Sequence, residues 1–130
     1  MFERHLEDFL IINWKNTHLG DAYDIYTKDG ELLGRQFRTD TGPLDILALS
    51  KDGKEFLVVE LKRDRASDQV VGQTLRYMGW VKKNLCTKAQ VVRGCIVALS
   101  GDAKLENALH MVDNISFVRY EVDCRLIDEN

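Results

Sequence analysis

The sequence predicts an α/β fold in which a central mixed β-sheet is flanked by helices, with its elements in the order αββ-ββ-αβαβ. Three observations support this. Amphipathic patterns of helical period open the chain and fill its middle. Two pairs of apolar runs are each joined by a short turn that contains Asp-Gly, which is typical of β-hairpins. The last third alternates a strand-like run, a helical pattern and another strand-like run.

Size and composition indicate a compact globular protein. We expect residues 1–130 to form a single domain, and the apolar fraction of 45% and charged fraction of 30% are ordinary for a soluble one. No apolar run approaches the roughly 18–20 residues of a membrane span, so we expect no membrane contact. We also expect no signal peptide, because the chain opens directly on an amphipathic pattern. The three scattered cysteines form no C-x-x-C pair and favour reduced thiols in a cytoplasmic protein.

The first third predicts a helix and a hairpin. Tyr23–Thr27 and Leu32–Phe37 flank Lys28–Glu31 and predict the first hairpin. A helix is expected before it, over residues 2–14, because one set of positions recurs at helical spacing. These positions are Phe2, Leu6, Phe9, Leu10 and Asn13.

A second hairpin is expected to join Leu44–Ser50 to Phe56–Lys62, with Pro43 at the start of its first strand. A two-residue turn at Asp52-Gly53 gives cross-strand partners whose numbers sum to 105, so Asp45 would face Glu60. Directly opposed Cβ atoms lie about 4.5–5.5 Å apart. A three-residue loop with a bulge at Gly53 would shift this register by one residue.

A long helix is predicted from a cap at Ser67 or Asp68 to about Leu85. Its buried stripe is expected at Val71, Leu75, Met78 and Leu85, with Val81 on the flank. Gln69, Gln73, Arg76, Trp80 and Lys83 share the opposite side, and Tyr77 lies between the two. The remaining elements are a strand at Gly94–Leu99, a helix at Lys104–Val112 and a strand at Ile115–Val122.

Asp45, Glu60 and Lys62 are expected on one face of the second hairpin, since side chains alternate along strands. Facing carboxylates destabilise a sheet unless a positive group lies between them. Mg²⁺ prefers hard oxygen ligands, so the two carboxylates and the Leu61 carbonyl suit Mg²⁺ or Mn²⁺ beside a phosphodiester. Lys62 would orient or deprotonate the attacking water and stabilise charge on the phosphate. The alternative is a surface ion pair of Lys62 with Glu60 or Asp64.

The net charge of −3 is unevenly distributed. Residues 62–93 hold eight basic and two acidic residues, a balance of +6 that leaves −9 for the rest of the chain. This segment is typical either of a surface that binds a polyanion or of a solvated helix face.

Gly42-Pro43-Leu44-Asp45 and Glu60-Leu61-Lys62 together resemble the PD-(D/E)xK motif of the restriction-endonuclease-like superfamily. Residues 2–80 resemble more specifically the catalytic domain of the EndoMS/NucS family, which cuts mismatched or branched DNA. The matching stretches are Phe2–Leu10, Gly42–Ala48, Val58–Arg63 and Val71–Met78.

The resemblance implies a restriction-endonuclease-like core with Asp45 and Glu60 as metal ligands and Lys62 as the catalytic lysine. It also implies Glu3 as an acid supplied by the first helix, and Gln73 and Tyr77 as site residues on the long helix. Glu3 borders the buried face of its helix and could point inward, whereas Glu7 is expected to point further toward solvent.

The expected function is that of a metal-dependent DNA endonuclease domain, in repair or defence. We expect no counterpart here of the family's extra N-terminal DNA-binding domain, so the resemblance implies nuclease chemistry without mismatch specificity. A partner could supply specificity. Trp80 could stack on an unpaired base, anchor a dimer contact or be buried. The residues expected to contact DNA are Arg63, Arg65, Arg76, Trp80 and Lys83.

Two alternatives remain open. One is a dimeric nuclease similar to the Holliday-junction resolvases, which share this fold and a similar size. The other is a nucleic-acid-binding module that keeps the fold without catalysis. Retention of Asp45, Glu60 and Lys62 argues against the second alternative, because binding alone does not require two facing carboxylates.

Overall fold

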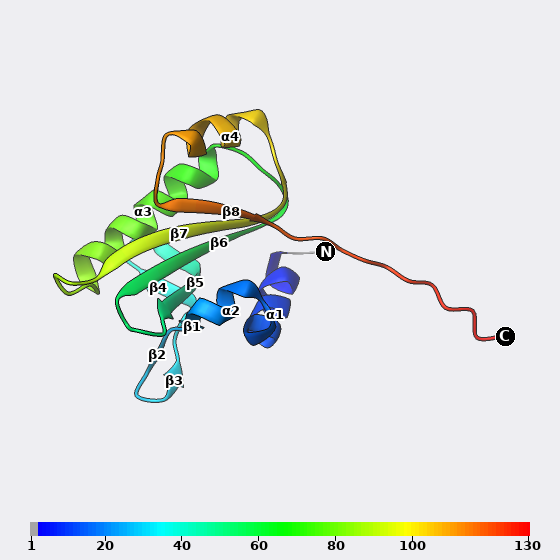
Figure 1. The fold of residues 1–130 in the computed structure, drawn as a ribbon, viewed down its shortest axis with the longest axis horizontal. Helices are drawn as coiled ribbons and strands as arrows, with labels where there is room; N and C mark the ends of the chain where they lie inside the picture. The colour runs from blue at the N-terminus through cyan, green and yellow to red at the C-terminus, as the bar shows by residue number, and fades with distance from the viewer. Residues whose placement is uncertain (1–2) are drawn as a thin grey trace.

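The structure, a computed structural model, describes residues 3–130; Phe2, where the first helix was expected to begin, lies outside the described residues. Figure 1 shows the arrangement of the elements. They are α1 (Glu3–Asn13), a 3₁₀ turn (Trp14–Asn16), α2 (His18–Ala22), β1 (Tyr23–Ile25), β2 (Thr27–Lys28), β3 (Glu31–Leu32), β4 (Arg35–Thr39), β5 (Gly42–Ser50), β6 (Glu55–Ala66), α3 (Gln69–Asn84), β7 (Val91–Gly101), α4 (Ala103–His110) and β8 (Ile115–Arg119).

The main sheet is mixed, as predicted. Its strand order is β1-β5-β6-β7-β8, and β4 also pairs with β5. Neighbours up to β6 run antiparallel, whereas β6 with β7 and β7 with β8 run parallel. Helices α3 and α4 cover one face of the sheet and α1 and α2 cover the other (Figure 1). The α/β fold with a flanked mixed sheet is therefore confirmed.

Two apolar cores lie on the two faces of this sheet. Val58 packs in the core beneath α3, whereas the next residue, Val59, packs with Leu6 and Leu10 of α1. This follows from the alternation of side chains along β6, which is apolar on both sides because helices cover both. Full burial of one valine or leucine contributes roughly 1.5–3 kcal/mol to the free energy of folding, so the buried side chains of these strands stabilise the fold strongly.

The register of the second hairpin is confirmed. Ile46 pairs with Val59 and Leu49 pairs with Phe56, and both pairs sum to 105. The loop itself is longer than expected, because residues 51–54 lie outside the strands. Ser50 and Asp52 oxygens accept from the Lys54 amide within this loop. A four-residue loop centred on the same two positions keeps the same sum.

The prediction of the first hairpin was only partly correct. Only β2 and β3 pair with one another, while β1 and β4 lie one after the other along the same edge of β5. Gly34, which lies between β3 and β4, allows the chain to return to the edge of β5. Its backbone lies so close to β5 that an added Cβ would meet the Leu47 carbonyl oxygen at 2.2 Å.

Both long helices are rotated relative to the sequence prediction. On α1, Phe9 is 61% exposed and Glu7 is only 6% exposed. On α3, Leu75 is 40% exposed, while Thr74 and Tyr77 are buried. Thr74 satisfies its hydroxyl by donating to the Val70 carbonyl at 2.7 Å, so the polar group is tolerated in the core.

The start of α3 and the end of the chain also differ from expectation. Asp68 occupies the N-cap of α3 without a side-chain capping bond. Strand β8 ends at Arg119 rather than Val122, and residues 120–130 have no regular structure. Tyr120 fastens the start of this segment, because its amide donates to the Ala98 carbonyl and its hydroxyl to the Arg63 carbonyl.

Among the helices of residues 3–130, none is long and apolar enough to cross a membrane.

Candidate active site

The two predicted carboxylates meet where β5 separates from β6. Backbone pairing of the two strands ends at Ile46 and Val59, one position before Asp45 and Glu60. Beyond that point the Asp45 side chain supplies the hydrogen bond between the strands, because its Oδ2 accepts from the Leu61 amide at 2.8 Å. The Asp45 carboxylate therefore occupies the place of a main-chain partner and holds the diverging strands together.

Glu60 is the most unusual ionisable residue of this site. Its side chain is on β6, only 3% of the residue is exposed, and Oε1 has no hydrogen-bond partner within the described part of the chain. Burial and, after it, the neighbouring Asp45 carboxyl together raise the pKa of Glu60 to about 10, against the opposing charges of Lys62 and Arg76. An unpartnered buried oxygen is rare in folded proteins and calls for a specific explanation.

The residues present fit a divalent cation with hard oxygen ligands. The orphaned Glu60 oxygen, the adjacent Asp45 carboxylate and the Leu61 carbonyl are the donors expected from the sequence. Within residues 3–130 no cluster of three or more His, Cys, Asp or Glu side chains is arranged to hold a metal. The donor set is therefore limited to two carboxylates and a carbonyl, which suits Mg²⁺ because that ion usually keeps several waters.

Lys62 follows on the same strand and lies near these acids. It is half-buried, and its charge lowers the pKa of Glu60. The β6–β7 register shifts between Lys62 and Arg65, so a bulge follows the lysine directly. The ion pair with Asp64 is made by Arg63, at 3.3 Å, rather than by Lys62.

Helix α3 contributes Gln73 and Tyr77 on the same face of the sheet as Glu60. Gln73 is half-buried. Tyr77 is 4% exposed, and its hydroxyl lies 3.5 Å from where a Cβ on Gly42 would stand. Tyr77 therefore packs against the start of β5. Gly42 at this point has a φ of 113°, a conformation that favours glycine. Their participation in chemistry stays a prediction.

The first helix presents a different acid from the one expected. Glu3 is exposed, whereas Glu7 is buried, so the expectation that Glu7 points to solvent is wrong. Glu7 accepts from Arg35 Nε at 2.8 Å and from Gln36 Nε2 at 3.0 Å. The same Gln36 amide donates to Asp45 Oδ1 at 3.3 Å. Glu7 is thus linked to the site through Gln36, and a role of Glu3 stays a prediction.

Sequence reasoning missed Gln36 altogether. Nothing in its residue type or spacing marks it, because glutamine is common on exposed strands. Gln36 stands out only in the structure, through its backbone: its φ is 49°, and only a few per cent of non-glycine residues have a positive φ.

The residues expected to contact DNA fall into two groups. Arg63 and Arg65 are exposed on β6 just beyond the site. Arg76 lies over the Tyr77 ring, at 5.0 Å from its centroid. Trp80 packs edge-on against Phe37. A cavity of about 250 Å³ brings the α3 residues together with the β4–β5 turn, and it is lined by Asp40, Thr41, Arg76, Gly79, Trp80, Lys83 and Asn84.

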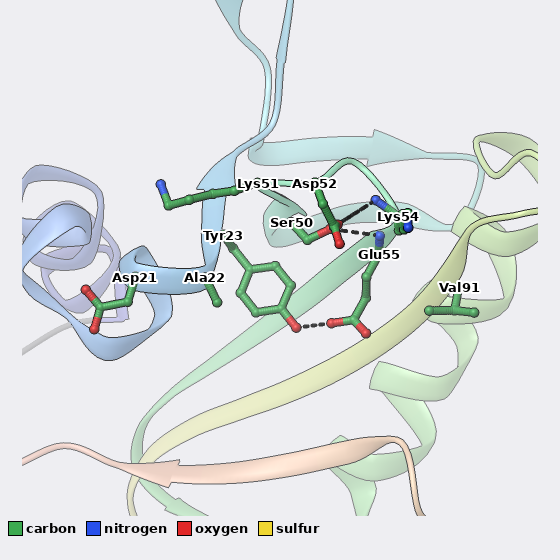
Figure 2. A pocket seen from close by; sticks show the side chains of 9 residues that line it. All are labelled: Asp21, Ala22, Tyr23, Ser50, Lys51, Asp52, Lys54, Glu55 and Val91. Carbon is green, nitrogen blue, oxygen red and sulfur yellow. Dashed lines mark hydrogen bonds between the residues drawn. The ribbon is translucent and has the colours of Figure 1, made fainter.

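The basic segment 62–93 does not form a single face. Arg93 donates to Glu55 at 3.1 Å, and Glu55 also accepts from the Tyr23 hydroxyl. Figure 2 shows the Tyr23–Glu55 contact beside an open cavity of about 440 Å³ at the tip of the β5–β6 hairpin. This cavity is at the other end of the strands from Asp45 and Glu60, and its charges are mixed. It is no part of the candidate site.

The chain is similar to known proteins over most of its length. A family model described as the Endonuclease NucS C-terminal domain matches residues 3–125. Endonuclease NucS of Methanocaldococcus jannaschii is 32% identical over 96 residues, and that of Sulfolobus acidocaldarius is 31% identical over 96 residues. Each alignment covers 74% of this chain but 35% of the relative, so the chain spans about a third of the length of these relatives.

Solved structures agree on the fold. A repair endonuclease from Pyrococcus abyssi superposes with a TM-score of 0.72 at 23% identity, over 93% of this chain and 47% of that one. An EndoMS–dsDNA complex gives a TM-score of 0.72 at 24% identity, over 95% and 46%. Because the family model matches nearly the whole chain, the protein belongs to the family of the Endonuclease NucS C-terminal domain.

Proposed function

We propose that this chain is a metal-dependent DNA endonuclease domain that hydrolyses phosphodiester bonds, acting in DNA repair. Family membership supports the endonuclease class. The observation that carries the metal dependence is the buried Glu60 oxygen without a partner beside the Asp45 carboxylate. A buried carboxyl beside a second, half-buried carboxylate is costly for a protein that only binds, and a cation would explain why both are present.

Each residue has a defined task in this proposal. Asp45, Glu60 and the Leu61 carbonyl would hold Mg²⁺ or Mn²⁺, and the ion would supply neutralisation of phosphate charge and activation of water. Lys62 donates to the phosphate or to the attacking water and so stabilises the negative charge that develops in the transition state. Tyr77 would fix the start of β5, and Gln73 would donate to the substrate. Glu7, buried and linked to Asp45, is a better candidate than Glu3 for the acid from α1.

Duplex or branched DNA would lie along the surface of α3 and the end of β6. Arg76 and Lys83 line the α3 cavity, and Arg63 and Arg65 lie beyond the acids. Contacts of this kind neutralise phosphates and carry little sequence information. We therefore propose that the shape of the DNA, rather than its sequence, selects the substrate. A similar protein has been solved with double-stranded DNA, which supports DNA as the partner.

The direct test is a cleavage panel with Mn²⁺. Branched, mismatched and plain duplex DNA are each incubated with the parent chain and with Glu60→Gln. We expect the parent to cut at least one substrate and Glu60→Gln to be slower by roughly 100-fold or more, the scale of losing one electrostatic contact in the transition state.

Glu106→Gln is the matched control, because Glu106 is an exposed carboxylate on α4. It should cut like the parent. The proposed function fails if the parent cuts nothing or if Glu60→Gln cuts as well as the parent. Tight DNA binding without cleavage would favour the binding-module alternative.

A further inference from the structure

Gln36 combines an uncommon backbone conformation with two contacts to acids. It lies on β4 with φ of 49°, in the left-handed region. Holding a non-glycine residue there costs about 1–3 kcal/mol, and such strain persists only where the surrounding structure enforces it. Glutamine lacks the short side chain that lets asparagine and aspartate adopt this conformation more readily. The position therefore has a stability cost that its contacts must justify.

This conformation reverses the faces of β4. In a regular strand Arg35 and Phe37 would share a face. Here Arg35 binds Glu7 on the α1 side, whereas Phe37 packs on the α3 side, where its ring contacts Trp80. The strand therefore crosses from one core to the other at Gln36.

Strand β5 makes the same crossing at Asp45. Leu44 belongs to the core beneath α3 and Ile46 to the core beneath α1. Arg35 pairs with Ile46 and Phe37 with Leu44, so Gln36 and Asp45 lie between the same two pairs. The paired irregularity places the two side chains next to each other, and the Gln36 amide reaches both Asp45 and Glu7 of α1.

The Gln36 amide joins two acids at this point. Nε2 lies 3.0 Å from Glu7 Oε2 and 3.3 Å from Asp45 Oδ1, and it donates to both of these oxygens. One NH₂ group has two protons, so it can serve both. Together with the Leu61 amide, Gln36 gives each Asp45 oxygen one donor and fixes the orientation of the carboxylate.

We infer that Gln36 is a positioning residue that orients Asp45 for metal binding and ties it to Glu7 on α1. This rests on the proposed function. Residues that orient a metal ligand typically change metal affinity or activity by about 10–100-fold when they are replaced. Glu7 retains Arg35 when Gln36 is removed, so the buried acid stays paired and the fold is expected to survive.

Two variants of the full chain separate this role from a structural one. Gln36→Gly removes both the amide and the backbone strain. Gln36→Met keeps a side chain of similar length but has no donor. We expect both to bind Mn²⁺ about tenfold more weakly or worse by calorimetry and to show a lower kcat with an unchanged KM for DNA. Gln36→Gly should melt at or above the parent temperature without metal, because the strain is relieved.

The control is Asp29→Gly. Asp29 is the other non-glycine residue with positive φ among residues 3–130, at 54°, and it lies between β2 and β3. It should gain similar stability and leave Mn²⁺ affinity and cleavage as in the parent.

Parent-like Mn²⁺ affinity and kcat in both Gln36 variants would overturn the inference, as would a fall in metal-free melting temperature in both. A raised KM with unchanged kcat would also overturn it, since that indicates direct DNA contact. If the parent neither binds Mn²⁺ nor cuts DNA, the proposed function fails and this inference fails with it. If the parent does both, a negative result concerns Gln36 alone.

Discussion

Glu60 is maintained at a cost to the metal-free fold. Its carboxyl is buried, one oxygen lacks a partner among residues 3–130 and a second carboxylate is adjacent. The folded-state pKa of about 10 lies far above the ordinary value of 4.5. The folded chain therefore retains a proton that the unfolded chain releases above pH 4.5, so stability falls as pH rises from 4.5 toward 10.

We predict that Glu60→Gln stabilises the metal-free protein at pH 8. The glutamine is neutral and can donate to Asp45, which removes a penalty of about 1–3 kcal/mol for an unsatisfied buried group. Thermal unfolding in EDTA should show a higher melting temperature for the variant. With excess Mn²⁺ the parent alone should gain stability. A variant that is less stable than the parent at pH 8 would contradict this account.

Tyr23 offers a second pH prediction, far from the acids. Burial and the Glu55 carboxylate raise the pKa of Tyr23 to about 12 from 10.0. The stability from this group is complete below pH 10 and is lost as pH rises through 12. Tyr23→Phe should therefore lose less stability between pH 9 and pH 11 than the parent does. Urea unfolding at the two pH values measures the difference, and equal losses would contradict it.

At the scale of elements, the orientation of α3 decides what reaches the site. The helix approaches β7 so closely that a Cβ on Gly94 would lie 2.7 Å from Thr74 Cγ2. A small residue fits that contact and a leucine does not, which explains why Thr74 is buried and Leu75 is turned outward. The rotation also carries Tyr77 inward, against the start of β5.

We predict unequal effects for two alanine substitutions on this helix. Val81 is fully buried, so Val81→Ala should cost about 2 kcal/mol of unfolding free energy from lost burial and the cavity left behind. Leu75 is 40% exposed, and Leu75→Ala should cost less than about 1 kcal/mol. Chemical denaturation measures both values. The reverse ranking would restore the orientation predicted from the sequence.

How far sequence predicts these elements depends on what fixes each one. The β5–β6 register follows from two apolar runs placed symmetrically about Asp52-Gly53, so it was predictable even though the loop is longer than two residues. The rotation of α1 and α3 depends on close packing against the sheet. A stripe of apolar residues tolerates several rotations, and neither Glu7 nor Thr74 shows in its residue type that it is buried.

For the whole molecule, the two ends of the β5–β6 hairpin have different surroundings. The tip is closed by Tyr23, Glu55 and Arg93, whereas the acids and the exposed arginines lie at the open end. The positive charge of residues 62–93 is therefore divided between the two, although it is continuous in the sequence. The charge pattern of the sequence could not reveal this division. Because β6 and β7 run parallel, their first residues lie at the same end of the sheet, although α3 separates the two strands along the chain.

We predict that DNA binding depends on Arg76 and Lys83 but not on Arg93. The double variant Arg76→Gln, Lys83→Gln should reduce the slope of log affinity against log salt by about 2, close to 0.9 for each lost phosphate contact. Arg93→Gln should leave the slope unchanged. Fluorescence anisotropy over a salt series gives these slopes. Equal effects of all three residues would indicate that the basic segment binds DNA as one surface.

The bond from the Leu61 amide to Asp45 bears on how related sequences are interpreted. Position 45 needs an acceptor wherever β5 and β6 diverge in this way, whether or not the protein cuts anything. A relative that has lost catalysis would still be under selection to keep aspartate or asparagine there. Glu60 Oε1 accepts no such bond within residues 3–130, and replacing this carboxyl removes the energetic cost of burying it. In a survey of this family, the residue at position 60 is therefore the more informative marker of which members remain enzymes.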